Sequence, residues 1–201
     1  MISLKRFSGL LLILGSLLAL AISTDSSLLD LEVSVDNSFT ASLNSLPQIV
    51  INEIYYWPDE AHSQPEGNEE EFEWLELYNL ENFEVSLKDW QISKPLALPP
   101  QTLTIHANVK IPPKGFLLIS RNASIWPRFW GLNPSQINLL TLGANIKSEL
   151  DNFGESLLLK DNNGNQIDRI DYKGGQKGYS FSRQPNGSHN FTHLFPPTPA
   201  R

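Results

Sequence analysis

The chain has 201 residues, of which 40% are hydrophobic, 10% aromatic and 18% charged. This length suits one packed domain with a short additional segment and excludes a large multidomain enzyme. The composition is too apolar for a wholly disordered chain, and a formal net charge of -7 argues against nucleic-acid binding through phosphate contacts. The lack of cysteine excludes disulfides, thiolate metal sites and thiol nucleophiles, and it points toward a prokaryotic surface setting.

The first 23 residues have the layout of a secretory signal peptide. Lys5 and Arg6 precede an apolar run from Leu10 to Ile22, and small residues precede Thr24. The run is short for a membrane span, which needs about 20 residues. We therefore predict a signal helix over residues 1–23 that is cleaved near Ser23–Thr24, with secretion or display at the cell surface. An uncleaved N-terminal anchor is the alternative, and membrane contact is expected only through such an uncleaved signal.

Residues 24–46 are rich in Ser, Asp and Asn and predict a linker, a tether or a loosely ordered first strand. Within them, Asp36–Ala41 resembles the segment that follows the signal in SipW-type signal peptidase substrates, the TasA- and camelysin-like secreted proteins. Those proteins carry an aromatic residue followed by Asp-Thr-Glu at the signal boundary, whereas this chain has Thr24–Ser27 there. The resemblance implies, as one alternative, a structural subunit of an extracellular matrix.

From residue 47 onward, short β-rich runs alternate with turn residues, which predicts an all-β domain over residues 47–199. The Asn163–Gly164 pair is the strongest hairpin signal, and we expect it to form a type I′ turn. The predicted strands are Ile49–Tyr56, Glu73–Tyr78, Val85–Ile92, Thr102–Ile105, Phe116–Ser120, Ser156–Lys160, Ile167–Tyr172 and Tyr179–Phe181.

About eight short strands in this length favour an immunoglobulin-like β-sandwich, in which side chains alternate between the core and the outer face. Leu75 and Leu77 are then expected on one face, with Trp74, Glu76 and Tyr78 on the other. Residues 122–150 are too apolar for an exposed loop. We predict that they form an insertion with a helical turn folded against the sandwich.

Several motifs in order along the chain carry a family resemblance. They are Ile49–Ile54, Glu73–Asn79 with its Trp-Leu-Glu core, Val85–Ser93, Ile111–Phe116, Asn152–Leu159, Asp161–Asp168, Gly178–Arg183 and Pro197–Pro199. Over residues 48–199 the chain resembles the lamin tail domain family, in its prokaryotic exported form. That resemblance implies an immunoglobulin-like sandwich without an active site of its own, of the kind found in nuclear lamins and in exported bacterial and archaeal proteins.

An acidic loop is the first candidate site. Its carboxylates could be a solvated surface, a weak divalent cation site or a catalytic pair, and we expect the solvated surface because paired carboxylate catalysis needs a cleft. Glu53 and Glu76 recur in the family pattern and are interpreted as strand residues with local hydrogen bonds. The eight acidic residues are Asp59, Glu60, Glu66, Glu69, Glu70, Glu71, Glu73 and Glu76.

Other polar patterns are weaker. Asp161–Asn165 begins like a calcium loop but lacks the later glycine and glutamate, so a hairpin turn is expected. His189 and His193 have helical zinc spacing, yet glycine and proline flank them and a loop is expected. His62 and His106 are isolated. Asn122, Asn186 and Asn190 begin glycosylation sequons, which arise often by chance.

No nucleophile elbow or phosphate-binding loop occurs in the sequence, and we assign no catalytic, cofactor-binding or metal-binding residue. Trp57, Trp126 and Trp130 lie outside the predicted strands, either as exposed anchors for a partner or as loop residues packed on the sheet. We predict a non-catalytic exported binding or surface-assembly module whose partner is a protein or cell-surface polymer. The alternatives are the matrix subunit and an accessory domain of a secreted hydrolase or nuclease system.

Overall fold

The computed structural model describes residues 30–33, 39–42, 46–64, 68–142 and 150–201, in two compact units, Met1–Leu46 and Pro47–Arg201. In the first unit, β1 (Asp30–Val33) pairs with β2 (Phe39–Ser42) in antiparallel fashion. The predicted signal over residues 1–23 and the start of the SipW-like phrase lie outside the described residues. Among the described residues, no helix has the length and apolar character needed to cross a membrane.

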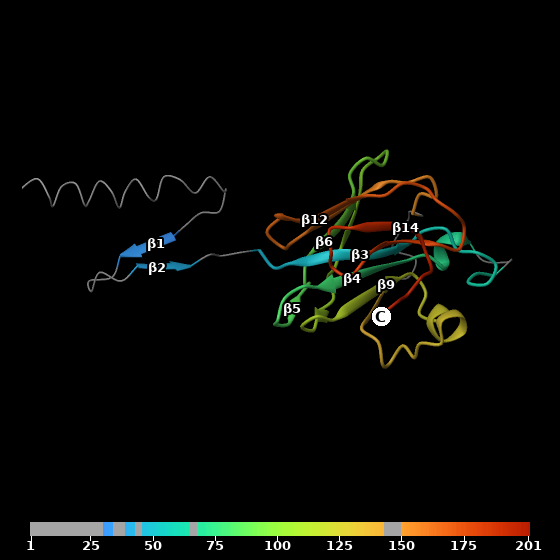
Figure 1. Ribbon diagram of the computed structural model, residues 1–201, viewed down its shortest axis with the longest axis horizontal. Helices are drawn as coiled ribbons and strands as arrows, with labels where there is room; N and C mark the ends of the chain where they lie inside the picture. Colours follow the sequence, from blue (N-terminus) through green and yellow to red (C-terminus); the bar gives the residue numbers. More distant parts are fainter. Residues whose placement is uncertain (1–29, 34–38, 43–45, 65–67, 143–149) are drawn as a thin grey trace, which may run out of the picture. The chain divides into compact units, whose positions relative to one another are not determined.

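The second unit is a sandwich of two main sheets (Figure 1). Neighbouring strands are antiparallel except β10 and β9, which run parallel. One sheet has the order β10 (Leu139–Thr141), β9 (Phe116–Ser120), β4 (Trp74–Asn79), β3 (Ile49–Tyr55), β13 (Ser180–Arg183), β14 (Phe191–Phe195). The other has the order β12 (Gln166–Asp171), β11 (Ser156–Lys160), β6 (Gln91–Lys94), β7 (Gln101–Thr104).

A short pair, β5 (Val85–Ser86) and β8 (Lys110–Ile111), joins the two sheets at one side. The only helical segments among the described residues are η2 (Glu69–Glu71) and η3 (Trp126–Trp130). This architecture confirms the predicted all-β sandwich and is consistent with an immunoglobulin-like fold.

The main core lies between the two sheets and follows the period of two that strands impose. Leu75 and Leu77 of β4 are buried in it, opposite Leu157 and Leu159 of β11. Trp90 and the β6 residue Ile92 complete the same layer. The face assignment made from the sequence is therefore confirmed for β4.

A second core covers the outer face of the six-stranded sheet. Tyr55, Trp74 and Leu118 point outward from β3, β4 and β9, and the insertion folds over them with the buried Ile125 and Trp126. The insertion thus contains the predicted helical turn, η3. Its later part adds a strand, β10, to the sheet edge.

One strand prediction and one loop prediction were wrong in detail. The range Val85–Ile92 is not one strand, because Asp89 has a φ of 64° and the N–H of Trp90 donates to the carbonyl of Leu87. This turn lets the chain pass from β5 into the four-stranded sheet. The segment around His189 and His193 is not only a loop, because Phe191–Phe195 forms β14.

The hairpin between β11 and β12 forms where it was predicted, but its turn type was wrong. A type I′ turn centred on Asn163 and Gly164 needs a positive φ at both residues. Only Gly164 has one, at 85°. The carbonyl of Asp161 accepts the N–H of Gly164, so a type I turn is followed by a left-handed glycine. The register then shifts by one residue at Leu159 and Lys160, as a bulge requires.

Candidate binding cleft at the loop end

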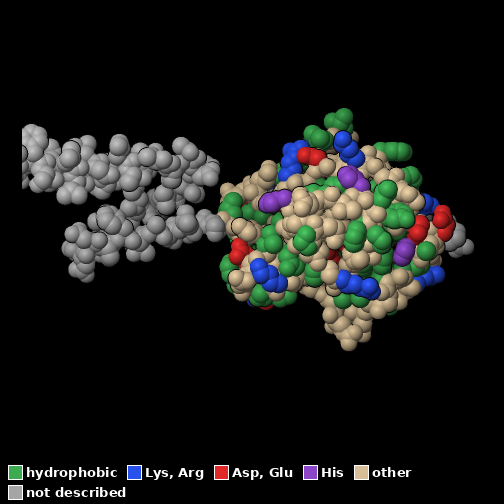
Figure 2. All heavy atoms as spheres, in the orientation of Figure 1, with side chains coloured by type: hydrophobic (Ala, Val, Ile, Leu, Met, Phe, Trp, Pro, Cys, Tyr) green, Lys and Arg blue, Asp and Glu red, His purple; other side chains and the backbone are tan. Residues whose placement is uncertain are grey.

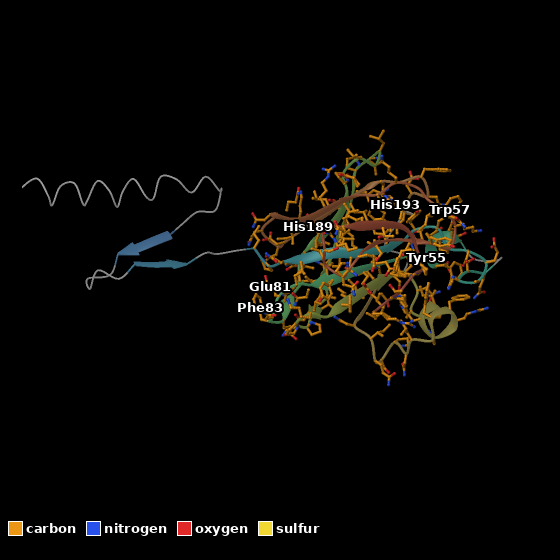
Figure 3. The ribbon with its side chains drawn as sticks, in the orientation of Figure 1. Tyr55, Trp57, Glu81, Phe83, His189 and His193 are labelled. Carbon is orange, nitrogen blue, oxygen red and sulfur yellow. The ribbon has the colours of Figure 1, made fainter. Side chains whose placement is uncertain are left out.

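One end of the sandwich carries most of the long loops, and we call it the loop end. Here β3, β6 and β9 end, and β4, β7 and β11 begin. Figure 3 labels Trp57 at this end and Glu81 with Phe83 at the opposite end. The described parts of the loops that meet here are residues 56–64, 68–73, 95–100, 121–138, 150–155 and 172–179.

A cleft of about 410 Å³ opens between the two sheets at the loop end. Strands β4 and β9 form one wall, and β6, β7 and β11 form the other. The aliphatic lining consists of Leu75, Ile92, Leu103, Ile119, Leu142, Leu150 and Leu157, with Pro99 at the side. The sequence pattern places these residues inward, so the cleft continues the main core toward solvent.

Charged side chains at the loop end are held in place by specific partners. Lys94 Nζ lies 2.8 Å from Glu155 Oε2, and Arg121 Nη1 lies 3.2 Å from Glu70 Oε1. The largely buried Glu73 accepts the N–H of Leu150 at 2.8 Å. Of these side chains, Lys94, Arg121, Glu70 and Glu73 line the cleft. An apolar cleft with a few fixed polar groups is the usual chemistry of a small-ligand site.

The residues of the acidic loop form more ion pairs and hydrogen bonds than the sequence predicted. Asp59 contacts its own loop through His62 at 2.6 Å, and Glu60 pairs with Lys177 at 2.8 Å. Glu69 accepts a hydrogen bond from Asn152 at 2.9 Å. The expectation of a solvated surface is wrong for Glu73 and Glu76, which are buried. Glu66 lies outside the described residues, and within the described part of the chain no group of three or more acidic or histidine residues is placed to hold a metal ion.

The tryptophans pack on the sheet, which was the alternative to exposed anchors. Trp126 is fully buried and its indole N–H donates to Ser120 Oγ at 3.2 Å, so it offers no surface to a partner. Trp130 is partly buried and stacks on His62, with ring centroids 4.3 Å apart. Trp57 is also partly buried and lies 6.3 Å from the ring of Phe153.

Glu53 and Glu76 are buried on the outer face of the six-stranded sheet, where residues 197–201, the C-terminal segment, lie over them. Glu53 accepts the backbone N–H of Thr198 at 3.0 Å and the hydroxyl of Ser180 at 2.5 Å. Glu76 accepts the N–H of Ala200 at 2.6 Å. The prediction of local hydrogen bonds was wrong, since these partners are more than 120 residues away in sequence.

The electrostatics of this pair follow from burial. Burial raises the pKa of Glu53 above its ordinary value, against the opposing effect of its hydrogen bonds. Burial likewise raises the pKa of Glu76 to about 8, and the charge of Glu53 adds to the shift. The chain's own backbone covers both carboxylates, so the pair holds the C-terminal segment and does not face an open cleft.

The remaining candidate residues, the calcium-like loop and the isolated histidines, contact neighbouring residues of the fold. Asp161 Oδ1 accepts the N–H groups of Asn163 and Asn165 at 2.9 and 2.8 Å, as expected for a hairpin turn. His193 lies on β14 against the ring of Phe181, with centroids 4.5 Å apart. His189 precedes that strand in a loop, and the exposed His106 lies 3.4 Å from Asp89.

Sequence reasoning missed the cleft and its charged residues. Lys94, Arg121 and Glu155 stand alone in the sequence, and no spacing links them. Their meeting depends on the pairing of β6 with β11 and of β4 with β9, which the sequence pattern alone does not reveal. The one available signal was the apolar character of residues 137–142, part of which lines the cleft through Leu142.

A search of curated proteins finds no significant match to this chain. The model of the Lamin Tail Domain family matches residues 43–174, more than half of the chain. The matched range contains both walls of the cleft and the hairpin β11–β12, while β13 and β14 follow it. Because this match covers more than half of the chain, the chain belongs to the Lamin Tail Domain family.

Proposed function

We propose that this protein is a non-catalytic, exported binding module that holds a small ligand in the cleft at the loop end. The observation that carries the proposal is the aliphatic cleft of about 410 Å³ with fixed charged residues beside it. Its volume lies within the range of roughly 300–1,000 Å³ that small-molecule sites occupy. The family is an immunoglobulin-like domain type that is generally without catalysis, in keeping with a binding role.

The paired carboxylates support the non-catalytic part of the proposal. Catalysis by Glu53 and Glu76 would need substrate access, yet Thr198 and Ala200 donate their backbone N–H groups to these side chains. Of the acidic residues that line the cleft, Glu70 pairs with Arg121 and Glu73 accepts the backbone N–H of Leu150. A general acid or base needs a free position beside the substrate, and these groups already have partners.

The matrix-subunit alternative is less well supported. Assembly through strand addition needs a long, flat and uncharged edge. In the described sheets, β10 has 3 residues and β7 has 4, and the edge strand β12 carries Asp168, Arg169 and Asp171. The edge pairing of β14 with β13 is irregular. These features weigh against polymerisation through the sandwich.

The layout of residues 1–23 supports export, which mass spectrometry of the protein from its native host tests directly. We expect a chain that begins near Thr24, in the medium or the wall fraction. An intact Met1 in the membrane fraction would mean an anchored surface protein instead. An intact chain in the cytosolic fraction would contradict export.

Native mass spectrometry of the recovered protein tests ligand binding, because a bound small molecule adds mass whether or not it is identified. Leu103 lines the cleft, so Leu103→Trp is expected to fill it and remove the adduct. Thr104 is the next residue on β7 and is not part of the lining, so Thr104→Trp is the matched control and keeps the adduct. An adduct that survives Leu103→Trp, or none in the wild type, contradicts the cleft as the binding site.

A further inference from the structure

Three apolar side chains extend into solvent from two loops at the loop end. Leu98 is 96% exposed, Phe153 84% and Leu96 72%. Figure 2 shows hydrophobic side chains projecting beyond the body of the sandwich, and the β6–β7 loop that carries both leucines projects in Figure 1. We call Leu96, Leu98 and Phe153 the apolar tips. Moving three side chains of this size from water into an apolar environment is favourable.

The two loops are joined at their bases. Lys94, the last residue of β6, forms its ion pair with Glu155, two residues after Phe153. The carbonyl of Phe153 also accepts the N–H of Gly174, which anchors this loop to the next one. The tips therefore project from a fixed base, and the loop of Leu96 and Leu98 contributes Pro99 to the side of the cleft.

The chemistry of the tips favours hydrocarbon over a protein partner. Energetic centres of protein interfaces are rich in Trp, Tyr and Arg set in well-packed, desolvated pockets, and leucine is under-represented among them. Here leucine and phenylalanine stand on separate loops. Lys173, which is exposed, lies beside the Phe153 loop, where its ammonium group can reach a phosphate headgroup while the tip lies deeper.

We propose that the loop end docks on a phospholipid bilayer, with Leu96, Leu98 and Phe153 inserted among the lipid chains. This inference rests on the proposed binding function and deepens it, since it names the ligand class of the cleft as an acyl chain. The aliphatic lining matches such a chain, and the cleft opens at the end of the sandwich that carries the tips. The charged residues Lys94 and Arg121 already have carboxylate partners, so insertion of the apolar tips is the main driving force.

Co-sedimentation with vesicles tests the docking. One set is pure phosphatidylcholine and the other adds phosphatidylglycerol, and the purified chain is expected to bind both. The triple variant Leu96→Ser, Leu98→Ser, Phe153→Ser is expected to bind at least tenfold more weakly. Phe83→Ser is the matched control, because Phe83 is a 57% exposed apolar residue at the opposite end, and it is expected to bind like the wild type.

Any contribution of the N-terminal segment is common to all of these variants, so the comparison isolates the tips. The inference is overturned if the wild type binds neither vesicle, or if the triple variant binds as tightly as the wild type. Binding only to the anionic vesicles that vanishes at high salt also overturns it, because a charge-driven contact would then replace insertion.

The acyl-chain part is tested separately. The wild type incubated with phosphatidylcholine vesicles is expected to carry a lipid adduct in native mass spectrometry, and Leu103→Trp is expected to lose that adduct while still binding vesicles. A non-lipid adduct from the host, together with no vesicle binding, would overturn this inference and leave the proposed binding function standing. Loss of every adduct with intact vesicle binding would overturn both the cleft as a binding site and the acyl-chain assignment, and would leave only the docking of the apolar tips.

Discussion

Glu53 and Glu76 are cross-strand partners on β3 and β4, and each accepts a backbone N–H group from the C-terminal segment. The two N–H groups belong to residues two apart, Thr198 and Ala200, and the turn at Pro199–Ala200 brings both toward the sheet. Asn186 adds a third contact through the carbonyl of Arg201 at 2.8 Å. Two buried carboxylates thus accept the backbone N–H groups of the last residues, as the carbonyl groups of a neighbouring strand would.

This arrangement predicts a stability that depends on pH. Both carboxyl pKa values are raised by burial, that of Glu76 to about 8, so the folded state binds protons more tightly than the unfolded state. The resulting stabilisation is full below the ordinary glutamate pKa of about 4.5 and is lost as the pH rises through about 8. Urea denaturation is expected to give a lower free energy of unfolding at about pH 9 than at about pH 5, by roughly 1.4 kcal/mol per unit of pKa difference.

The matching variant is Glu76→Gln, which keeps the size of the side chain and one of its two acceptor positions, toward Asn52 or Ala200, and removes the ionisable group. Its stability is expected to change much less between the two pH values. Glu84→Gln serves as the control, because Glu84 is exposed and pairs with Lys110, and it should keep the wild-type pH dependence. Equal slopes in wild type and Glu76→Gln would refute the assignment.

The second core predicts a large cost for Trp126→Ala. Trp126 has no exposed surface, contacts Trp74 and donates to Ser120, so its removal leaves a cavity and a Ser120 hydroxyl that keeps only its bond to the carbonyl of Asn122. We expect a loss of about 3–5 kcal/mol in the free energy of unfolding. Trp57→Ala, at a partly buried site in the loop after β3, should cost about 1 kcal/mol or less. Similar losses for the two variants would mean that the insertion is not a core element.

A buried ion pair links the two sheets and predicts a second large effect. Arg183 of β13 donates to Asp168 of β12 at 3.0 Å, and Asp168 also accepts the N–H of Ile51 at 2.7 Å. Asp168→Ala leaves the buried guanidinium of Arg183 without this carboxylate, at an expected cost of about 3–5 kcal/mol. Arg169→Ala breaks an exposed pair with Asp171 and should cost about 0–1 kcal/mol in the same denaturation assay. Asp168→Ala at wild-type stability would exclude the pair as a link between the sheets.

Two glycines with positive φ should differ in their tolerance of a side chain. Gly164 has a φ of 85°, and a Cβ there would meet nothing within 4 Å among the described residues, so Gly164→Ala should cost only about 1 kcal/mol of backbone strain. At Gly154 a Cβ would lie 2.5 Å from the carbonyl oxygen of Tyr172. Gly154→Ala should therefore lower the thermal midpoint clearly more, and equal midpoints would contradict the close approach.

The sequence predicted the fold better than the site because the two depend on different ranges of interaction. Leu75, Leu77 and Trp74 reveal the faces of β4 through alternation alone, and Asn163–Gly164 marks its hairpin through local backbone preference. Neither signal tells which residues that are far apart in the sequence meet in the folded chain. The partners of Glu53 come from β13 and the C-terminal segment, and they meet it only once the sheet has formed.

The burial of Trp126 was uncertain from sequence for the same reason. A tryptophan in a long insertion can cover a sheet or face a partner, and both choices look alike in the sequence. In the structure Trp126 packs against Trp74 and so covers the sheet. The cleft was out of reach of sequence patterns because it is a space left between side chains that each follow an ordinary strand pattern.

The chain enters the sandwich at the end opposite the loop end. Gln48 is hydrogen-bonded to Leu80 and Glu81, and Figure 3 labels Glu81 and Phe83 at the end of the sandwich opposite Trp57. Any carrier, anchor or reporter fused ahead of Pro47 is therefore attached at the rear of the sandwich. Immobilised through that point on a sensor chip or a particle, the domain would have its loop end turned away from the support.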